Sequence, residues 1–366
     1  MSQTLLVTVD SLRYDCLDRM PATKGALGSW HDHAYATCTA TLGSFPAIVG
    51  GQYADGSELR AGASVANAFD CRTVGITTNH FLSPRYGYDD GFDSFSSPHG
   101  GGSLKDRVAD RLTVGSPVYR VASAAYNAVQ SVRDQFDGVS KSFRPADDVI
   151  DEFLGTVSMD DEWFGWLHFM EPHYPYDPDG GGVSRSRAQA LSRRVVAGDG
   201  TPEENELVRE LYQREVAELD SALARLWDTI PGDATVVFSA DHGELLGEDG
   251  LWGHPGVVRP ELLHVPYGMR NTPSPGELVS TIDTPTLLTG AEWGEGTFDR
   301  SVAYASYGDT RVAINRDAIA STDGTTTHDG QPTDAPQLER KLARFDSGSV
   351  VKEDAAEEDL EELGYL

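Results

Sequence analysis

Residues 4–10 read TLLVTVD, a short apolar and β-branched run that ends in an acid. This pattern predicts a buried strand with a carboxylate at its C-terminal end. Residues 234–241 read ATVVFSAD, and His242 follows directly. Open α/β sheets build their sites at the carboxyl ends of strands. We therefore expect Asp10, Asp241 and His242 to meet at one edge of a sheet.

The rest of the chain alternates between strand and helix patterns. Apolar runs at residues 72–78 and 162–170 predict two more strands, and the patterns at 57–69 and 203–227 predict helices. Such alternation is typical of an α/β fold with a mostly parallel central sheet flanked by helices. Within the stretch TLGSFPAIVGG, Ser44 is expected to cap a helix with Pro46 in its first turn. Thr41 would then lie just before that helix.

Three segments differ in character from this alternation. Residues 98–145 and 180–200 carry no readable chemical pattern and are interpreted as insertions, the first as a lid and the second as a loop. Residues 296–366 predict a small α+β subdomain, with an antiparallel sheet over 301–349 and an acidic terminal helix over 353–366. We expect this subdomain to pack on a catalytic domain of residues 1–295.

The charge of the chain is strongly negative, at -29 from 58 acidic and 29 basic residues, of which five are lysine. Molar salt shortens the screening length to roughly 3 Å, so such a surface predicts a salt-adapted cytoplasmic protein. The alternative is an acidic surface that meets a basic partner. Nucleic acid is disfavoured as a partner because its phosphates require clustered Lys and Arg.

No run of residues is long and apolar enough for a membrane span or a secretory leader, so a cytoplasmic location is expected. The three cysteines show no spacing that predicts a disulfide framework or a zinc knuckle. Carboxylate and imidazole at the strand ends suit a divalent cation. Taken singly, however, a strand-end Asp is more often a cap, and His254 is more often a surface histidine.

Seven segments in order resemble the sulfatase-like branch of the alkaline phosphatase superfamily, of haloarchaeal type. They are VTVDSLRYD at 7–15, TLGSFPAIVGG at 41–51, HFMEPHYPY at 168–176, FSADHGELLGEDGLWGH at 238–254, ELLHVPYGMR at 261–270, VSTIDTPTLLTG at 279–290 and LEELGY at 360–365. The resemblance implies an alkaline phosphatase-like fold and a metal-dependent hydrolase or transferase.

The resemblance also implies roles for individual residues. Thr41 falls on the position of the family nucleophile, and one divalent metal (Ca, Mn or Mg, with Zn an option) would be held by Asp10, Asp241, His242 and Thr41 itself. His173 and His254 would act on the substrate as catalytic residues. Substrate binding would fall to Ser44, Asn79 and Arg259. A second metal is not expected, because position 224, four residues after Asp220, is Ala224.

The chain departs from a true sulfatase at three places. Sulfatases carry a modified cysteine at the position of Thr41 and an arginine at the position of Phe45, and a Lys-x-His segment is missing around Asn79. A hydroxyl nucleophile suits phosphorus, so we expect phosphate or phosphonate esters to react through a covalent phosphothreonine. A sulfatase is the alternative, and a catalytically silent binding protein is a further one. The expected substrate is a small anionic ester, including one linked to a glycan or a lipid.

Overall fold

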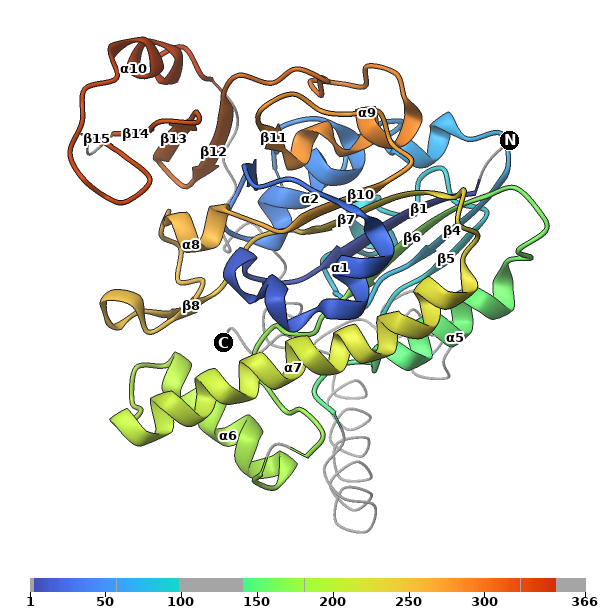
Figure 1. The fold of residues 1–366 in the computed structure, drawn as a ribbon, viewed down its shortest axis with the longest axis horizontal. Helices are drawn as coiled ribbons and strands as arrows, with labels where there is room; N and C mark the ends of the chain where they lie inside the picture. The colour runs from blue at the N-terminus through green and yellow to red at the C-terminus, as the bar shows by residue number, and fades with distance from the viewer. Residues whose placement is uncertain (1–2, 57, 99–140, 181, 323, 347–366) are drawn as a thin grey trace, which may run out of the picture.

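The structure is a computed structural model that describes residues 3–56, 58–98, 141–180, 182–322 and 324–346. Its centre is a seven-stranded sheet in the order β2-β10-β7-β1-β6-β4-β5 (Figure 1). Five strands run parallel: β1 (Thr4–Val9), β4 (Arg72–Ile76), β5 (Ser94–Ser96), β6 (Trp163–Phe169) and β7 (Thr235–Ala240). The strand β10 (Tyr267–Arg270) is antiparallel to β7, and β2 (Ser29–Trp30) is antiparallel to β10. The prediction of a mostly parallel sheet is confirmed.

Helices cover both faces of this sheet. In Figure 1, α5 and α7 lie along one side, and α2 and α9 lie along the other. The bounds are α1 (Pro21–Leu27), α2 (Thr41–Gly50), α5 (Ala146–Thr156), α6 (Arg185–Val196), α7 (Pro202–Thr229), α8 (Pro260–Leu263), α9 (Thr284–Thr289) and α10 (Pro336–Leu342). The described residues also contain the 3-10 turns η1 (Tyr14–Arg19), η2 (Val65–Ala68), η3 (Pro84–Tyr86), η4 (Glu248–Gly250) and η5 (Thr281–Asp283).

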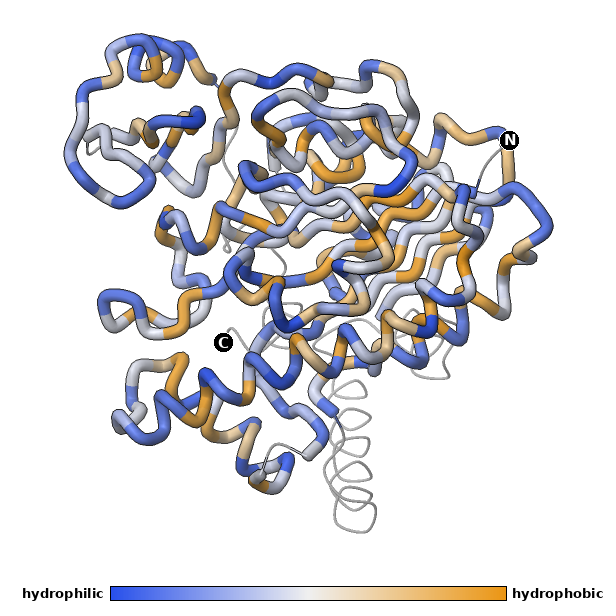
Figure 2. Tube along the Cα trace, in the orientation of Figure 1, coloured by the Kyte–Doolittle hydropathy of each residue, from blue (hydrophilic) through white to orange (hydrophobic). Residues whose placement is uncertain are grey.

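The central strand β1 explains where the core and the site lie. All six of its residues are buried, because it pairs with β6 on one side and β7 on the other. Apolar residues follow the strands in Figure 2, while hydrophilic and hydrophobic residues alternate along α7. In this register Val9 is opposite both Phe169 and Ala240. The residues that follow β1 and β7 therefore emerge side by side.

Two predictions about local structure were wrong. Residues 185–196, expected in a loop, form α6, whose Ala188, Leu191 and Val195 are buried at helical spacing. Several arginines in this helix hide that apolar stripe in the sequence. The segment 57–69, expected to be helical, contains only the short turn η2, since Gly62 adopts φ +76° and interrupts any longer helix.

The end of the described chain forms a separate four-stranded antiparallel sheet, as expected. It contains β12 (Ala303–Tyr307), β13 (Thr310–Ile314), β14 (Ile319–Ser321) and β15 (Gly324–Thr326), with α10 packed on it. A small apolar cluster of its own includes Val302, Ala313 and Leu338. Two short ribbons complete the fold: β3 (Ala34–Tyr35) with β11 (Val279–Ser280), and β8 (Leu245–Leu246) with β9 (Trp252–Gly253).

Two expected features lie outside the described residues, namely most of the 98–145 insertion and the terminal helix over 353–366. Within the described part of the chain, no helix combines the length and the apolarity that crossing a lipid bilayer requires.

Candidate active site

Asp10 follows the last residue of β1 and is fully buried. Its backbone N–H donates to the carbonyl of Phe169 on β6 at 2.9 Å, so the sheet fixes its position. Asn79 donates to its Oδ2 at 2.9 Å and Ser11 donates to its Oδ1 at 3.0 Å. Burial by itself raises the pKa of Asp10, but three neighbouring imidazoles, above all His173, outweigh burial and hold this pKa below its usual value.

Asp241 and His242 follow β7 and are buried beside Asp10. The Oδ1 of Asp241 accepts from the backbone N–H groups of Ser11 and His242, at 3.1 and 2.8 Å. The Nδ1 of His242 lies 2.8 Å from the carbonyl oxygen of Gly243. Because a carbonyl only accepts, the neutral ring carries its proton on Nδ1 and keeps a lone pair on Nε2. That Nε2 lies 3.5 Å from Asp241 Oδ2 and 3.9 Å from Asp10 Oδ1.

Only glycine fits at position 243, because the backbone of Glu261 lies very close to it. A Cβ there would lie 2.0 Å from the backbone oxygen of Glu261. The absence of a side chain therefore lets the segment after His242 pack directly on α8.

These three residues fit a divalent cation. One ligand atom from each of Asp10, Asp241 and His242 can be chosen so that all lie within 4.8 Å of one another. Within the described part of the chain, the buried Oδ2 of Asp241 accepts no hydrogen bond, which is costly for a carboxylate oxygen unless a cation binds it. Burial, and then the charge of Asp10, raise the pKa of Asp241 well above its usual value. A cation between the two carboxyls would offset both effects.

Thr41 is the first residue of α2 and is buried next to this group. Its hydroxyl donates to Asp10 Oδ2 at 3.3 Å. The helix begins four residues earlier than the sequence predicts, because the capping residue is Ala40 and not Ser44. Ala40 adopts an extended conformation, and its carbonyl accepts from the N–H of Ser44. Thr41 therefore lies within the first turn of α2, where free backbone N–H groups favour negative charge.

Two further histidines lie close to the metal ligands. The ring of His254 is 4.6 Å from that of His242, and the ring of His173 is 5.2 Å from that of His254. His254 Nδ1 lies 3.0 Å from Glu244 Oε1, and the carboxylate of Glu244 also accepts from the hydroxyl of Tyr176 at 3.2 Å. The Nδ1 of His173 forms a hydrogen bond with the carbonyl oxygen of Tyr174. Hydrogen bonds at Nδ1 thus orient the rings of His254 and His173. In each ring, Nε2 is the nitrogen that can transfer a proton to or from the substrate.

Two residues of this group, His168 and Glu244, are not among those that the sequence predicts. His168 is buried on β6 with Nε2 at 3.7 Å from Asp10 Oδ2 and Nδ1 at 3.1 Å from Thr8 Oγ1. It lies inside an apolar strand, where a histidine looks like an ordinary core residue. Its position at the carboxyl end of a strand was the available signal. The ring of Phe45 packs edge-on against His168 at 5.0 Å, so an apolar ring occupies the position of the family arginine.

Ser44, Asn79 and Arg259, which are expected to bind substrate, contact other protein groups in the structure. The hydroxyl of Ser44 donates to the carbonyl of Cys38 at 3.1 Å, which braces the turn before α2. Asn79 donates to Asp10, and its Oδ1 accepts from the N–H of Phe81 at 2.9 Å. Arg259 forms an exposed ion pair with Asp249 at 2.6 Å, and no described contact joins it to Thr41.

Asp220 and Arg13 hold neighbouring segments of the chain together. Both carboxylate oxygens of Asp220 accept backbone N–H groups at the start of α1, from Ala22 and Thr23. Arg13 binds Asp15 in a bidentate pair at 2.8 and 2.6 Å, and it donates to the backbone oxygen of Glu244 at 2.9 Å. Arg13 therefore connects the segment after β1 to the segment after β7.

Solved structures with this architecture cover almost the whole chain. A phosphonate monoester hydrolase from Silicibacter pomeroyi is 17% identical with a TM-score of 0.59, over 94% of this chain and 93% of its own. The lipoteichoic acid synthase LtaP from Listeria monocytogenes is 13% identical with a TM-score of 0.60, over 93% and 89%. A protein solved with its substrate D-glucosamine-2-N,6-O-disulfate is 12% identical with a TM-score of 0.62, over 99% and 98%.

These likenesses, at such low identity, establish the fold. No curated protein matches the sequence significantly. Residues 67–278, more than half of the chain, match the family model described as Sulfatase. The chain therefore belongs to the sulfatase family and is an enzyme of the alkaline phosphatase superfamily.

Proposed function

We propose that this protein is a single-metal hydrolase or transferase of phosphate or phosphonate esters that reacts through a covalent phosphothreonine at Thr41. The observation that carries the proposal is the placement of one hydroxyl nucleophile. Thr41 lies in the first turn of α2 and 3.3 Å from Asp10, beside the carboxylates and imidazole that fit a cation. In this proposal residues 1–295 carry the chemistry, and residues 296–366 form a subdomain packed on them.

The reaction has two displacements at phosphorus. The hydroxyl of Thr41 loses its proton to solvent, and its oxygen forms a bond to phosphorus as the bond to the leaving oxygen breaks. His254 or His173 protonates that leaving oxygen. The N–H groups of the first turn of α2 donate to the non-bridging oxygens. Water or an acceptor alcohol then attacks phosphorus and gives its proton to the same histidine. The bond to Thr41 breaks, and the threonine oxygen takes up a proton from solvent, which restores the hydroxyl. A divalent cation, when bound, favours loss of the threonine proton and absorbs charge on the ester oxygens.

Matched esters separate this function from that of a sulfatase. A sulfated threonine has no gem-diol through which to expel sulfate, and Phe45 offers no positive charge to the ester. We expect p-nitrophenyl phosphate or p-nitrophenyl phenylphosphonate to be hydrolysed faster than p-nitrophenyl sulfate under identical conditions. Faster turnover of the sulfate ester would overturn the proposal in favour of a sulfatase, the candidate that the family match favours.

The bound cation is expected to be a single Ca²⁺, Mn²⁺ or Mg²⁺, with Zn²⁺ an option, because the ligand set combines carboxylates with one imidazole. We expect elemental analysis of the purified protein to find about one divalent ion per chain, and Asp241→Asn to lose it. Asp249→Asn, at an exposed surface pair, is the matched control. Turnover by protein that contains no metal would contradict this assignment. A chain that binds metal and ester but turns over none of the esters would instead be a silent binding protein.

The substrate is proposed to be a small anionic ester, including one attached to a glycan or a lipid. The names of two similar structures support this range, since one is a lipoteichoic acid synthase and the other was solved with a disulfated glucosamine. Nucleic acid is not proposed as a partner, because the chain carries 58 acidic residues against 29 basic ones.

Adaptation to a salt-rich cytoplasm of haloarchaeal type is a further part of the proposal, and it rests on the charge of -29. Repulsion among these charges weakens the folded state at low ionic strength and is screened at molar salt. We expect the melting temperature to rise by several degrees between 50 mM and 2 M KCl. Equal melting temperatures at the two concentrations would refute the adaptation. Because sulfate salts also strengthen apolar burial, KCl is the appropriate salt.

A further inference from the structure

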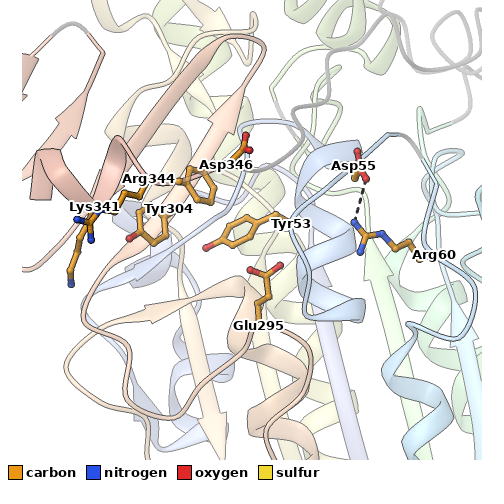
Figure 3. A pocket seen from close by; sticks show the side chains of 9 residues that line it. Tyr53, Asp55, Arg60, Glu295, Tyr304, Lys341, Arg344 and Asp346 are labelled. Atoms are coloured by element: carbon orange, nitrogen blue, oxygen red, sulfur yellow. Dashed lines mark hydrogen bonds and ion pairs between the residues drawn. The ribbon is translucent and has the colours of Figure 1, made fainter.

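A cavity lies away from Thr41, between the segment that follows α2 and the C-terminal sheet (Figure 3). Its volume is about 560 Å³, within the range of roughly 300–1,000 Å³ that small-molecule sites occupy. Thr41 begins α2, and Tyr53 of the cavity lies beyond the end of that helix. Ten helical residues span about 15 Å, so the two places are distinct.

Aromatic side chains form one wall of this cavity. The ring of Phe345 stacks on that of Tyr304 at 4.5 Å and meets Tyr53 edge-on at 4.9 Å. These rings join the core of the protein to the C-terminal sheet. The hydroxyl of Tyr53 is buried and has no hydrogen-bond partner among the described residues. A buried hydroxyl without a partner is costly, and it points to a ligand that can exchange a hydrogen bond with it.

The charged residues of the cavity differ from those of the chain as a whole. Three of its nine lining residues are basic, namely Arg60, Lys341 and Arg344, and three are acidic, namely Asp55, Glu295 and Asp346, whereas acids outnumber bases two to one over the full sequence. Arg60 pairs with Asp55 at 3.4 Å. No ion pair within the described part of the chain involves Arg344. The carboxylate of Glu295 lies next to Tyr53 in Figure 3 and supplies an acceptor.

We propose that this cavity binds a sugar residue that carries an anionic group. Aromatic faces pack against the C–H face of a sugar ring, while the Tyr53 hydroxyl and the Glu295 carboxylate pair with its hydroxyl groups. The guanidinium of Arg344 and the ammonium of Lys341 bind the anionic substituent, since charge-assisted hydrogen bonds are the stronger ones. The cavity thus holds a charged glycan unit at a distance from the reacting ester.

The test measures binding of glucose 6-sulfate, glucose 6-phosphate and glucose to the Thr41→Ala protein by titration calorimetry, so that no ester is consumed. We expect both anionic sugars to bind and glucose to bind at least about tenfold more weakly. Tyr53→Phe and Arg344→Ala should each weaken binding of glucose 6-sulfate about tenfold. Arg316→Ala, an exposed base paired with Glu277 outside the cavity, is the matched control and should bind normally.

Two results would overturn the proposal. One is the absence of binding by both anionic sugars up to millimolar concentrations, and the other is unchanged binding in Tyr53→Phe and Arg344→Ala. Equal binding of glucose would refute the requirement for an anion. In the otherwise unaltered protein, Arg344→Ala should leave hydrolysis of p-nitrophenyl phenylphosphonate unchanged. A parallel loss of that hydrolysis would place the sugar at the reacting site and refute a separate cavity.

Discussion

Thr41→Ala is expected to lower turnover of p-nitrophenyl phenylphosphonate by on the order of 10³-fold or more, because it removes the hydroxyl that forms the bond to phosphorus. The hydroxyl of Thr41 donates one hydrogen bond, to Asp10 at 3.3 Å, and its removal leaves the helix start intact. The loss should therefore appear in kcat while the melting temperature stays near that of the unaltered protein. Steady-state kinetics and thermal melting measure the two quantities.

Thr41→Ser is the matched control for that variant. Serine keeps the hydroxyl at the start of α2 and should retain a substantial part of the turnover. Protein quenched with acid during turnover should gain the mass of one phosphoryl or phosphonyl group, located by peptide mass spectrometry at residue 41. Full activity in Thr41→Ala, or a covalent adduct at another residue, would refute the assigned nucleophile.

Glu215→Gln is expected to stabilise the fold at pH 9 and to leave it nearly unchanged at pH 5. Glu215 on α7 and Glu171 after β6 are both buried, and each has one carboxylate oxygen without a hydrogen-bond partner among the described residues. Burial raises the pKa of Glu171 to about 7, and burial together with the charge of Glu171 raises the pKa of Glu215 to about 8. At alkaline pH both Glu171 and Glu215 are ionised in a buried environment, which destabilises the folded protein.

The direction of the pH effect follows from these raised pKa values. In the unfolded chain both acids ionise near pH 4.5, whereas the folded protein keeps their protons until pH 7 to 8. The free energy of unfolding should therefore fall as the pH rises from about 4.5 to about 8, and then level off. For Glu171 the shift from 4.5 to about 7 corresponds to about 3 kcal/mol. Glutamine cannot ionise and removes this dependence at the substituted position.

Urea unfolding at pH 5, 7 and 9 measures the effect. Glu206→Gln, an exposed residue on the same helix paired with Arg209, is the control and should follow the unaltered protein. The backbone N–H of Asp177 donates to the side chain of Glu215, and the amide oxygen of glutamine can accept the same hydrogen bond. If Glu215→Gln and the unaltered protein lose stability equally between pH 5 and pH 9, the buried pair is not the cause.

The parts of the fold that the sequence could predict are those where one local pattern decides the structure. The run TLLVTV has a single reasonable interpretation as a buried strand, and β1 spans Thr4–Val9. The long helix α7 has a capping box at Thr201 and Glu204 that marks its start. In α6, by contrast, exposed arginines obscure an apolar stripe that becomes clear only when the helix packs on α7.

Some residues of the candidate site could likewise be predicted from a local pattern in the sequence, and others could not. The acids at strand ends were accessible to sequence reasoning because strand order and direction bring such ends together. His168 was not accessible, because a histidine in an apolar strand becomes distinctive only when the neighbouring strand places Asp10 at 3.7 Å. The partners of Ser44 and Arg259 depend on side-chain directions that spacing along the chain does not determine. Tertiary packing, rather than local preference, fixes these contacts.

The amide groups of Asp10 and Asp241 donate to carbonyls of the adjacent strands, at 2.9 and 3.2 Å, in the middle of the sheet. Backbone groups at such positions exchange their hydrogens with solvent only when the whole domain opens, unlike those of surface loops. The ligands of a cation held there would share that protection. An ion could leave by the route that admits the ester, so its removal by a chelator should leave these two amides protected from exchange.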